Sequence, residues 1–341
     1  MSEKSLIKKA AEDFAAATLK PVAFEPEKTA TYTVEAVKAM ADKGFLKVAD
    51  MEEAAIVAEA FGYANASMAE VAIINNVLAQ TIEAYNASLG KGGIYGYALY
   101  EEGDSVGSGA KKVVAVKDGD AYKLTGEKFL AYMGGAADQY VVIAQLDEQP
   151  AAFVVDAADI KSAEKQDKLG LRSMPTAKLV FDGAKAALLS ADGAKVRAEI
   201  AAKKDILNIY MCAGVGQIAL ETSVEYAKTR VQFGAPIAKL PAVQFMLADI
   251  ATAIYNMKAA GATALALCVE GKPYILEAAM AKKISMKAAY DATTNALQIH
   301  GGTGYSREHE IERYYRDVKG AFFNNEYSEY AEKIVAADLL K

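Results

Sequence analysis

The spacing of apolar residues changes twice along this chain of 341 residues, and the two changes limit the folds that it can adopt. Residues 5–87 follow the helical period of apolar residues, whereas residues 94–189 form short apolar runs separated by turn signals. From residue 194 onward the helical period returns in longer units. The sequence therefore predicts an α+β fold with three parts: an N-terminal helical domain (residues 1–90), a middle antiparallel β domain (91–193) and a C-terminal four-helix bundle (194–341).

Individual elements can be placed within these parts. Apolar runs predict strands that pair as a sandwich or barrel, at residues 113–116, 140–144, 152–155 and 178–181. In the C-terminal part, the apolar residues between Val243 and Met257 recur at steps of three and four, which is the buried stripe of an amphipathic helix. Such patterns predict four bundle helices, at roughly residues 195–229, 240–270, 273–299 and 323–339.

Composition argues against several classes of protein. A content of 53% hydrophobic and 24% charged residues is typical of a folded chain with a large core. The formal net charge of −6 and the lack of a basic run argue against a nucleic-acid partner. The N-terminal residues contain no uninterrupted apolar stretch, so we expect a cytoplasmic protein with no membrane partner. Cys212 and Cys268 lie in apolar helical stretches, which favours two buried reduced thiols over a disulfide.

Two short segments carry residues suited to holding a phosphate group. The segment QIHGGTGY begins at Gln298, whose amide can donate a hydrogen bond, and its pair Gly301 and Gly302 lets the backbone approach a ligand closely. It is followed by RYYRD at residues 313–317. The segment RVQFGAP begins at Arg230, whose guanidinium is a forked cation. The two histidines, His300 and His309, match no metal-ligand or nucleophile pattern, and we expect no metal site.

These segments resemble the acyl-CoA dehydrogenase family, which carries R-x-x-F-G-x-P and, later, Q-x-x-G-G-x-G-Y followed by R-x-x-R-D. The resemblance covers nearly the whole chain and is strongest after Ser223. It implies a helix, β, helix order and an FAD shared between subunits. In that family the middle domain of one chain holds the isoalloxazine ring, and two segments of a neighbour reach the pyrophosphate and adenosine. The cofactor-binding residues that this implies are Arg230, Phe233, Gln298, Gly301 and Gly302.

The resemblance also marks departures from the family pattern. Counted from Gly301 without a gap, Asn325 occupies the usual position of the catalytic glutamate, and an asparagine cannot accept a proton. Glu326 fits a solvent-facing helix position, and it would serve as the base only if the alignment shifts by one residue. The chain thus resembles a shortened, divergent member that lacks the usual catalytic glutamate.

Further departures fall beside the expected flavin ring and acyl group. Two threonines near the ring are replaced by Tyr100 and Tyr132, which are large enough to fill the volume of a flavin. Asp205 stands where many relatives have an arginine that contacts acyl-CoA. Lys204 stands where some members carry their catalytic glutamate. Neither Asp205 nor Lys204 therefore replaces the missing base in a straightforward way.

Three functional hypotheses follow from this pattern. The favoured one is a non-catalytic subunit of a heteromeric acyl-CoA dehydrogenase of fatty acid metabolism, which lends its C-terminal segments to the FAD of a complete subunit. The second is a homo-oligomeric FAD enzyme that acts on an acyl-CoA or enoyl-CoA with an unusual base. The third is a flavin-free structural paralogue. The partners implied are a paralogous subunit or a second copy of the chain, acyl-CoA and electron-transfer flavoprotein.

Overall fold

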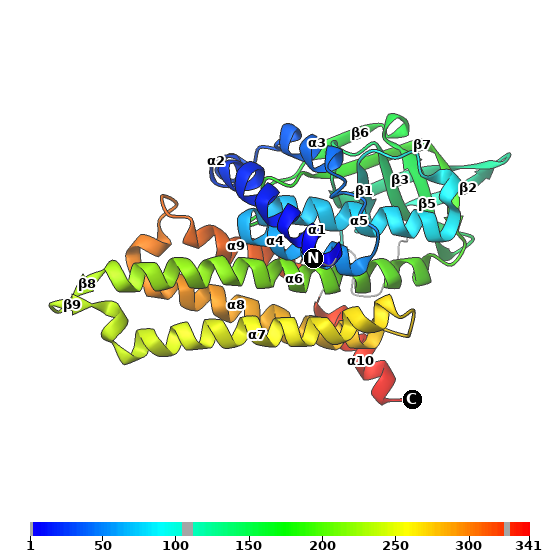
Figure 1. Cartoon of the computed structure of the whole chain (residues 1–341). Helices are drawn as coiled ribbons and strands as arrows, with labels where there is room; N and C mark the ends of the chain where they lie inside the picture. The colour runs from blue at the N-terminus through cyan, green and yellow to red at the C-terminus, as the bar shows by residue number, and fades with distance from the viewer. Residues whose placement is uncertain (1–2, 104–111, 324–327) are drawn as a thin grey trace.

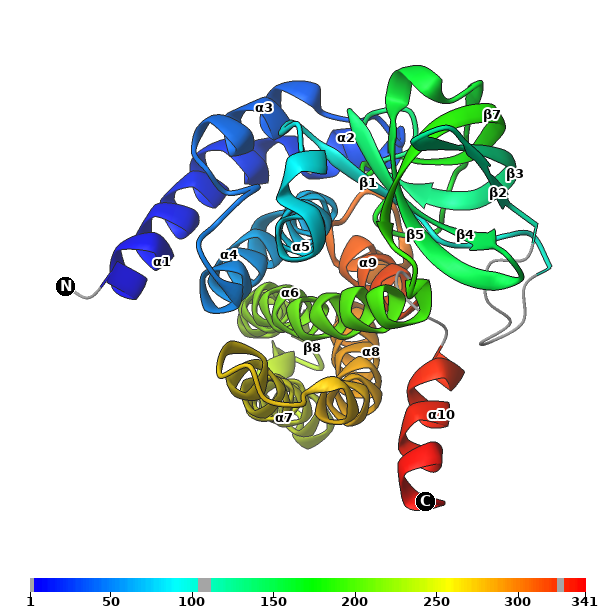
Figure 2. The same ribbon diagram turned by 90° about the vertical axis from the view of Figure 1, so that its right-hand side faces the viewer.

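The computed structural model of the chain describes residues 3–103, 112–323 and 328–341. The predicted positions Asn325 and Glu326 therefore lie outside the described residues. Three bodies of secondary structure pack together (Figure 1): a group of N-terminal helices, a β-sheet, and a bundle of long helices that runs beneath both. Viewed along the bundle, the N-terminal helices and the sheet lie side by side above α6 (Gly193–Thr229), while α10 (Ser328–Leu339) lies beside α8 (Ile275–Tyr305) (Figure 2).

The N-terminal helices are short except for two that are almost entirely buried, α4 (Met51–Ala64) and α5 (Ala66–Asn86). The helical pattern over residues 54–87 is split at Asn65, whose backbone is extended and whose side-chain oxygen accepts a hydrogen bond from the Met68 N–H at 3.2 Å. An asparagine that caps one helix in this way ends the preceding one. The other elements are α1 (Glu3–Phe14), η1 (Ala15–Leu19), η2 (Lys20–Val22), α2 (Phe24–Lys28), α3 (Val34–Asp42) and η3 (Ala87–Leu89).

The middle of the chain forms one seven-stranded sheet with the order β1-β3-β2-β4-β5-β7-β6. An additional pairing of β3 with β7 closes the sheet on itself. The pairs are mostly antiparallel, as the sequence predicts, but β4 pairs in parallel with both β1 and β2. The strands are β1 (Tyr95–Ala98), β2 (Val114–Asp118), β3 (Ala121–Tyr132), β4 (Gln139–Leu146), β5 (Gln149–Asp156), β6 (Ser162–Lys165) and β7 (Thr176–Ser190), with η4 (Ala157–Asp159) between β5 and β6.

The C-terminal bundle contains the helices that the sequence predicts and one more. The additional helix, α9 (Ile311–Phe323), packs against α6 and α8, and it was missed because charged residues occupy much of its buried face. The elements after α6 are β8 (Val231–Gln232), β9 (Ala235–Pro236), η5 (Ile237–Lys239), α7 (Pro241–Val269), α8 (Ile275–Tyr305), α9 and α10. None of the helices in the described part of the chain is long and apolar enough to cross a membrane.

Two glycines allow the backbones of α4 and α6 to touch. A Cβ atom added at Gly62 would lie 2.3 Å from the Met211 carbonyl oxygen, and one added at Gly214 would lie 2.2 Å from the Glu59 carbonyl oxygen. Both positions therefore exclude any side chain. This contact joins the N-terminal helices to the bundle. It thereby helps to set which residues of α5 and α6 lie opposite each other.

Candidate functional site

The predicted cofactor-binding residues gather at one end of the bundle. Arg230 directly follows α6, and its N–H donates to the Tyr226 carbonyl at 2.8 Å. Phe233 lies at the tip of the β8–β9 hairpin and is 93% exposed, with φ of 54°. The hairpin and the C-terminal end of α8 lie at the same end of the bundle (Figure 1). We call Arg230, Phe233, Gln298, Gly301 and Gly302 the nucleotide arm.

The α8 half of the nucleotide arm is open to solvent. Gln298, Gly301 and Gly302 are exposed, and a Cβ atom added at either glycine would meet nothing within 4 Å. Gly301 has φ of 56° and ψ of −136°, a conformation that is strained for every residue other than glycine. The turn at Gly301 therefore depends on glycine, while the space beside both glycines is free within this chain.

The resemblance places Tyr100 and Tyr132 beside a flavin ring. In this chain both side chains are buried, and their rings contact each other. Tyr132 is 3% exposed, and its ring centroid lies 6.4 Å from that of Tyr97, stacked, and 6.4 Å from that of Tyr100, edge-on. The turn after β1 is held by the buried ion pair of Glu101 with Lys128, in which the Lys128 Nζ lies 2.7 Å from the Glu101 carboxylate. The stacked and edge-on arrangements of the three tyrosine rings add to the stabilisation that their burial gives.

A buried ion pair completes this cluster. The Lys204 Nζ lies 3.0 Å from the Glu70 carboxylate, and both side chains are at most 1% exposed. The same Nζ lies 4.1 Å from the centroid of the Tyr132 ring, in cation–π geometry. Burial raises the pKa of Glu70, and the nearby Lys204 opposes that rise. We call Tyr97, Tyr100, Tyr132, Lys204 and Glu70 the ring-side cluster.

Asp205, the other departure on α6, also has a partner within the bundle. Its carboxylate lies 3.1 Å from the Lys282 Nζ on α8, and both side chains are buried. Sequence reasoning singled out Lys204 and Asp205 but missed Glu70 and Lys282. A signal for Glu70 was present, because it is a lone carboxylate within the apolar run of α5, and such a residue requires a buried partner.

A cavity of about 420 Å³ adjoins the ring-side cluster and is lined in part by Tyr100, Tyr132, Lys168 and Lys319. Burial lowers the pKa of Lys168 to about 8. The Lys168 Nζ donates to the Met174 carbonyl at 2.6 Å. A lysine with this pKa exchanges a proton more readily near neutral pH than an ordinary one. Sequence reasoning missed it, since no local pattern marks it as buried.

The R-x-x-R-D motif on α9 makes buried contacts within the chain. Asp317 accepts a hydrogen bond from the Leu171 N–H at 2.7 Å, and burial raises its pKa to about 6 although Arg313 lies 3.4 Å away. Arg316 binds both carboxylate oxygens of Glu27 on α2, at 2.5 and 2.9 Å. The motif therefore joins α9 to the N-terminal helices and to the loop before β7.

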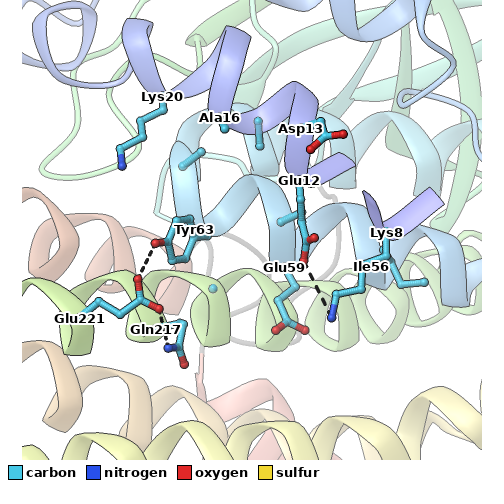
Figure 3. Close-up of a pocket in the computed structure, with 14 residues that line it drawn as sticks. Lys8, Glu12, Asp13, Ala16, Lys20, Ile56, Glu59, Tyr63, Gln217 and Glu221 are labelled. Atoms are coloured by element: carbon cyan, nitrogen blue, oxygen red, sulfur yellow. Dashed lines mark hydrogen bonds and ion pairs between the residues drawn. The ribbon is translucent and has the colours of Figure 1, made fainter. Parts of the chain in front are cut away.

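A second cavity, of about 700 Å³, lies between α1, α4 and α6 (Figure 3). The Tyr63 hydroxyl donates to Glu221 at 2.5 Å, and burial with this contact raises the pKa of Tyr63 to about 12. Lys8 and Glu12, one turn apart on α1, form an ion pair of 3.8 Å beside the same cavity. Its floor is formed by small residues such as Ala60 and Gly214. Neither the histidines nor the cysteines of the chain line this cavity.

No group of three histidine, cysteine, aspartate or glutamate side chains arranged to hold a metal ion occurs in residues 3–103, 112–323 and 328–341. Both cysteines are free; Cys212 is buried, whereas Cys268 is half-buried. Burial raises the pKa of both thiols, which makes them poor nucleophiles.

Comparison with known proteins gives consistent matches. Residues 192–340 match the family model described as acyl-CoA dehydrogenase, C-terminal domain. The chain is similar to 3-(aryl)acrylate reductase of Clostridium sporogenes, with 31% identity over 379 residues that cover 99% of each chain. It is similar to the mitochondrial short-chain specific acyl-CoA dehydrogenase of Bos taurus, with 31% identity over 98% of this chain and 90% of the relative. The solved structure of butyryl-CoA dehydrogenase from Megasphaera elsdenii aligns with a TM-score of 0.94 and 26% identity, covering 100% of this chain and 99% of that one.

Proposed function

Because the chain belongs to the acyl-CoA dehydrogenase family, we propose that it is a cytoplasmic subunit of a heteromeric acyl-CoA dehydrogenase of fatty acid metabolism. In this proposal the chain contributes its nucleotide arm to an FAD shared with a complete subunit, and it has no catalytic base of its own. The observation that carries the proposal is the contrast between an open nucleotide arm and a filled ring-side cluster.

The nucleotide arm fits the phosphate-bearing half of FAD. Arg230 offers a charge-assisted, forked set of donors, and Gln298 offers an amide donor. Gly301 and Gly302 leave room for a ligand to reach the backbone. All of these groups face outward at the end of the bundle, which suits a ligand held mainly by another subunit.

The ring-side cluster does not fit an isoalloxazine beside Tyr132. A ring placed there has to displace Tyr132 and the ammonium of Lys204 that lies over it. Moving Lys204 leaves Glu70 as an uncompensated charge in a site that is fully buried. Breaking a buried pair in this way costs roughly 3–5 kcal/mol. The cluster therefore supports a chain that folds without a flavin ring in its own middle domain.

The test is the flavin content of the purified chain, alone and co-expressed with a paralogous acyl-CoA dehydrogenase of the same organism. We expect FAD only in the assembled complex. Arg230→Ala and Gln298→Ala should lower the FAD retained there, since each removes a contact worth roughly 0.5–3 kcal/mol. Tyr132→Ala should leave the FAD content nearly unchanged. The opposite pattern, with Tyr132 essential and Arg230 dispensable, would show that this chain binds its own ring.

Assembly is a separate requirement of this proposal. The outer faces of α7 and α8 carry large exposed apolar side chains, among them Phe245 at 67%, Tyr255 at 73% and Ile284 at 56% exposure. Exposed apolar surface of this kind favours contact with another subunit. Light scattering at micromolar concentration should show an oligomer, with a second copy or with the paralogue. A stable monomer in both preparations would remove the shared-cofactor model.

One observation favours a second candidate, a homo-oligomeric FAD enzyme that acts on an acyl-CoA or enoyl-CoA. The full-length relative from Clostridium sporogenes is named a reductase of an unsaturated acid, and the cavity of about 420 Å³ adjoins the ring-side cluster. In this case the purified chain alone carries about one FAD per protomer and reduces an unsaturated acid or thioester, with electron-transfer flavoprotein as a possible redox partner. A preparation without FAD in any assembly would instead identify a flavin-free paralogue.

A further inference from the structure

The chain has only two histidines, and they meet beside the nucleotide arm. The His300 ring is stacked on Tyr226 of α6, with centroids 4.3 Å apart and planes 28° apart. The ring of His309, in the turn before α9, lies against the His300 ring, with centroids 4.9 Å apart. We call Tyr226, His300 and His309 the histidine stack. It joins the end of α6, the end of α8 and the turn before α9.

Two residues of the histidine stack lie close in sequence to the nucleotide arm: Tyr226 is four residues before Arg230, and His300 is directly before Gly301. The Tyr226 carbonyl accepts the hydrogen bond from the Arg230 N–H, so the Tyr226 ring lies in the last turn of α6, directly before the hairpin. His300 is followed immediately by Gly301, where the helix turns. The Tyr226 hydroxyl lies 3.5 Å from the His300 carbonyl oxygen. Because a peptide unit is planar, a contact that holds this carbonyl also sets the direction of the Gly301 N–H.

The His300 imidazole is held in one tautomer and one orientation. Its Nδ1–H donates to the Ala296 carbonyl at 2.8 Å, and its Nε2 receives no hydrogen bond from any residue that the structure describes. The residue is 2% exposed, and burial lowers its pKa, which favours the neutral ring. Contacts with the rings of Tyr226 and His309 limit the freedom of the His300 ring. It therefore acts as a fixed spacer between α6 and the turn that carries His309.

We infer that the histidine stack positions Arg230 and the Gly301–Gly302 turn relative to each other, so that both reach the same phosphate-bearing cofactor. The inference rests on the proposed function, because it assigns positioning residues to the nucleotide arm of that proposal. Binding sites tolerate only small displacements of the groups that form them, and a supporting layer of packed residues supplies that precision. Tyr226, His300 and His309 form such a layer, and motif-based sequence analysis assigned them no role.

The experiment measures FAD affinity in the assembled complex of the full chain, by flavin fluorescence, together with thermal unfolding. Tyr226→Leu and His300→Asn should each weaken FAD binding about tenfold, as expected when one well-placed contact is lost. His300→Asn keeps a donor for the Ala296 carbonyl, so it isolates the loss of the ring. Tyr226→Phe and His300→Phe keep a stacked ring and should restore affinity to within about threefold of the wild type.

Controls separate positioning from general destabilisation. Tyr85→Leu removes a similar half-buried tyrosine whose hydroxyl donates to Glu199 at the opposite end of α6, and FAD affinity should not change. If Tyr226→Leu does not assemble, His309→Leu removes the half-buried outer ring of the stack and should weaken binding about threefold. This inference alone is overturned if the leucine variants bind FAD with an affinity within twofold of the wild type while Arg230→Ala binds FAD more weakly. If Arg230→Ala also binds FAD normally, the proposed function itself is wrong.

Discussion

The ring-side cluster and the nucleotide arm lie in the same chain, and one resemblance singled out residues of both, yet the two regions differ in burial and in how their polar groups are paired. The ring-side cluster is buried and its charges are compensated inside the protein, as in the 3.0 Å contact of Lys204 with Glu70. The nucleotide arm is exposed, and Phe233 and the two glycines contact little of their own chain. A region filled by its own side chains stabilises the fold, whereas a region left open is suited to a ligand or another subunit.

The largest effect should come from breaking the buried pair. Lys204→Met should lower the free energy of unfolding by roughly 3–5 kcal/mol, because it leaves the Glu70 carboxylate buried without compensation. The double variant Lys204→Met with Glu70→Met should recover most of this loss, since apolar residues of similar size replace the pair. Urea unfolding measures both. Lys9→Met, which removes an exposed ion pair with Asp13, is the control and should have no measurable effect. Equal stabilities for the single and double Lys204 variants would contradict the role given to the pair.

Burial of charge near α9 should also make stability depend on pH. The pKa of Asp317 is raised from 3.8 to about 6 in the folded protein, so between these values the folded state binds more protons than the unfolded state. Stability from this residue is therefore fully present below pH 4 and is lost as the pH rises to about 6, by on the order of 1–3 kcal/mol. Unfolding measured from pH 4 to 7 should show a smaller fall for Asp317→Asn than for the wild type. A larger fall in the variant would reverse the assigned sign.

Two adjacent glycines test the nucleotide arm. Gly301→Ala should cost roughly 1–2 kcal/mol of stability, because φ of 56° strains an alanine. Gly302→Ala is the matched control: it has open space and no positive φ, so stability should hardly change. Both variants should nevertheless retain less FAD in the assembled complex, since a methyl group at either position obstructs approach to the backbone. Normal FAD retention in Gly302→Ala would remove that residue from the nucleotide arm.

The smallest effect is expected from placing a carboxylate at position 325. Asn325→Glu alone should give no appreciable dehydrogenase activity with acyl-CoA substrates, because Tyr132, Lys204 and Asp205 still oppose binding of the ring and the acyl group. The measurement is turnover with an artificial electron acceptor. Robust turnover would show that the pocket is otherwise intact. If the unmodified protein is active and Glu326→Gln abolishes activity, the base lies one residue later than the alignment places it.

Much of the fold was predictable because apolar periodicity survives in the exposed and half-buried elements. The long helices α6, α7 and α8 begin and end within a few residues of the predicted ranges, apart from the end of α8. Helix α9 was missed because the buried residues Arg313, Arg316 and Asp317 make it look solvent-facing. Buried charge hides a helix from any method that equates burial with apolarity. The predicted domain boundaries at residues 90 and 193 stay predictions.

The candidate site was predictable in part for a different reason. Arg230 and Gly301 belong to short motifs, and a motif places its residues without knowledge of the rest of the fold. The partner of Lys204 was not predictable, since Glu70 lies on another helix and no local spacing relates the two. The same holds for the contact of Tyr226 with His300, which depends on how α6 and α8 pack. Pairs far apart in sequence require the structure.

The contacts of the R-x-x-R-D motif change what its presence signifies. Arg316 holds Glu27, Asp317 holds the Leu171 N–H, and a Cβ atom added at Gly170 would lie 1.8 Å from the Arg316 carbonyl oxygen. These residues join α9 to α2 and to the loop before β7 through contacts within the chain. The signature therefore has an architectural role that does not depend on whether the chain catalyses a redox reaction. Because these contacts hold three parts of the chain together, the signature in a sequence is evidence for the fold before it is evidence for an activity.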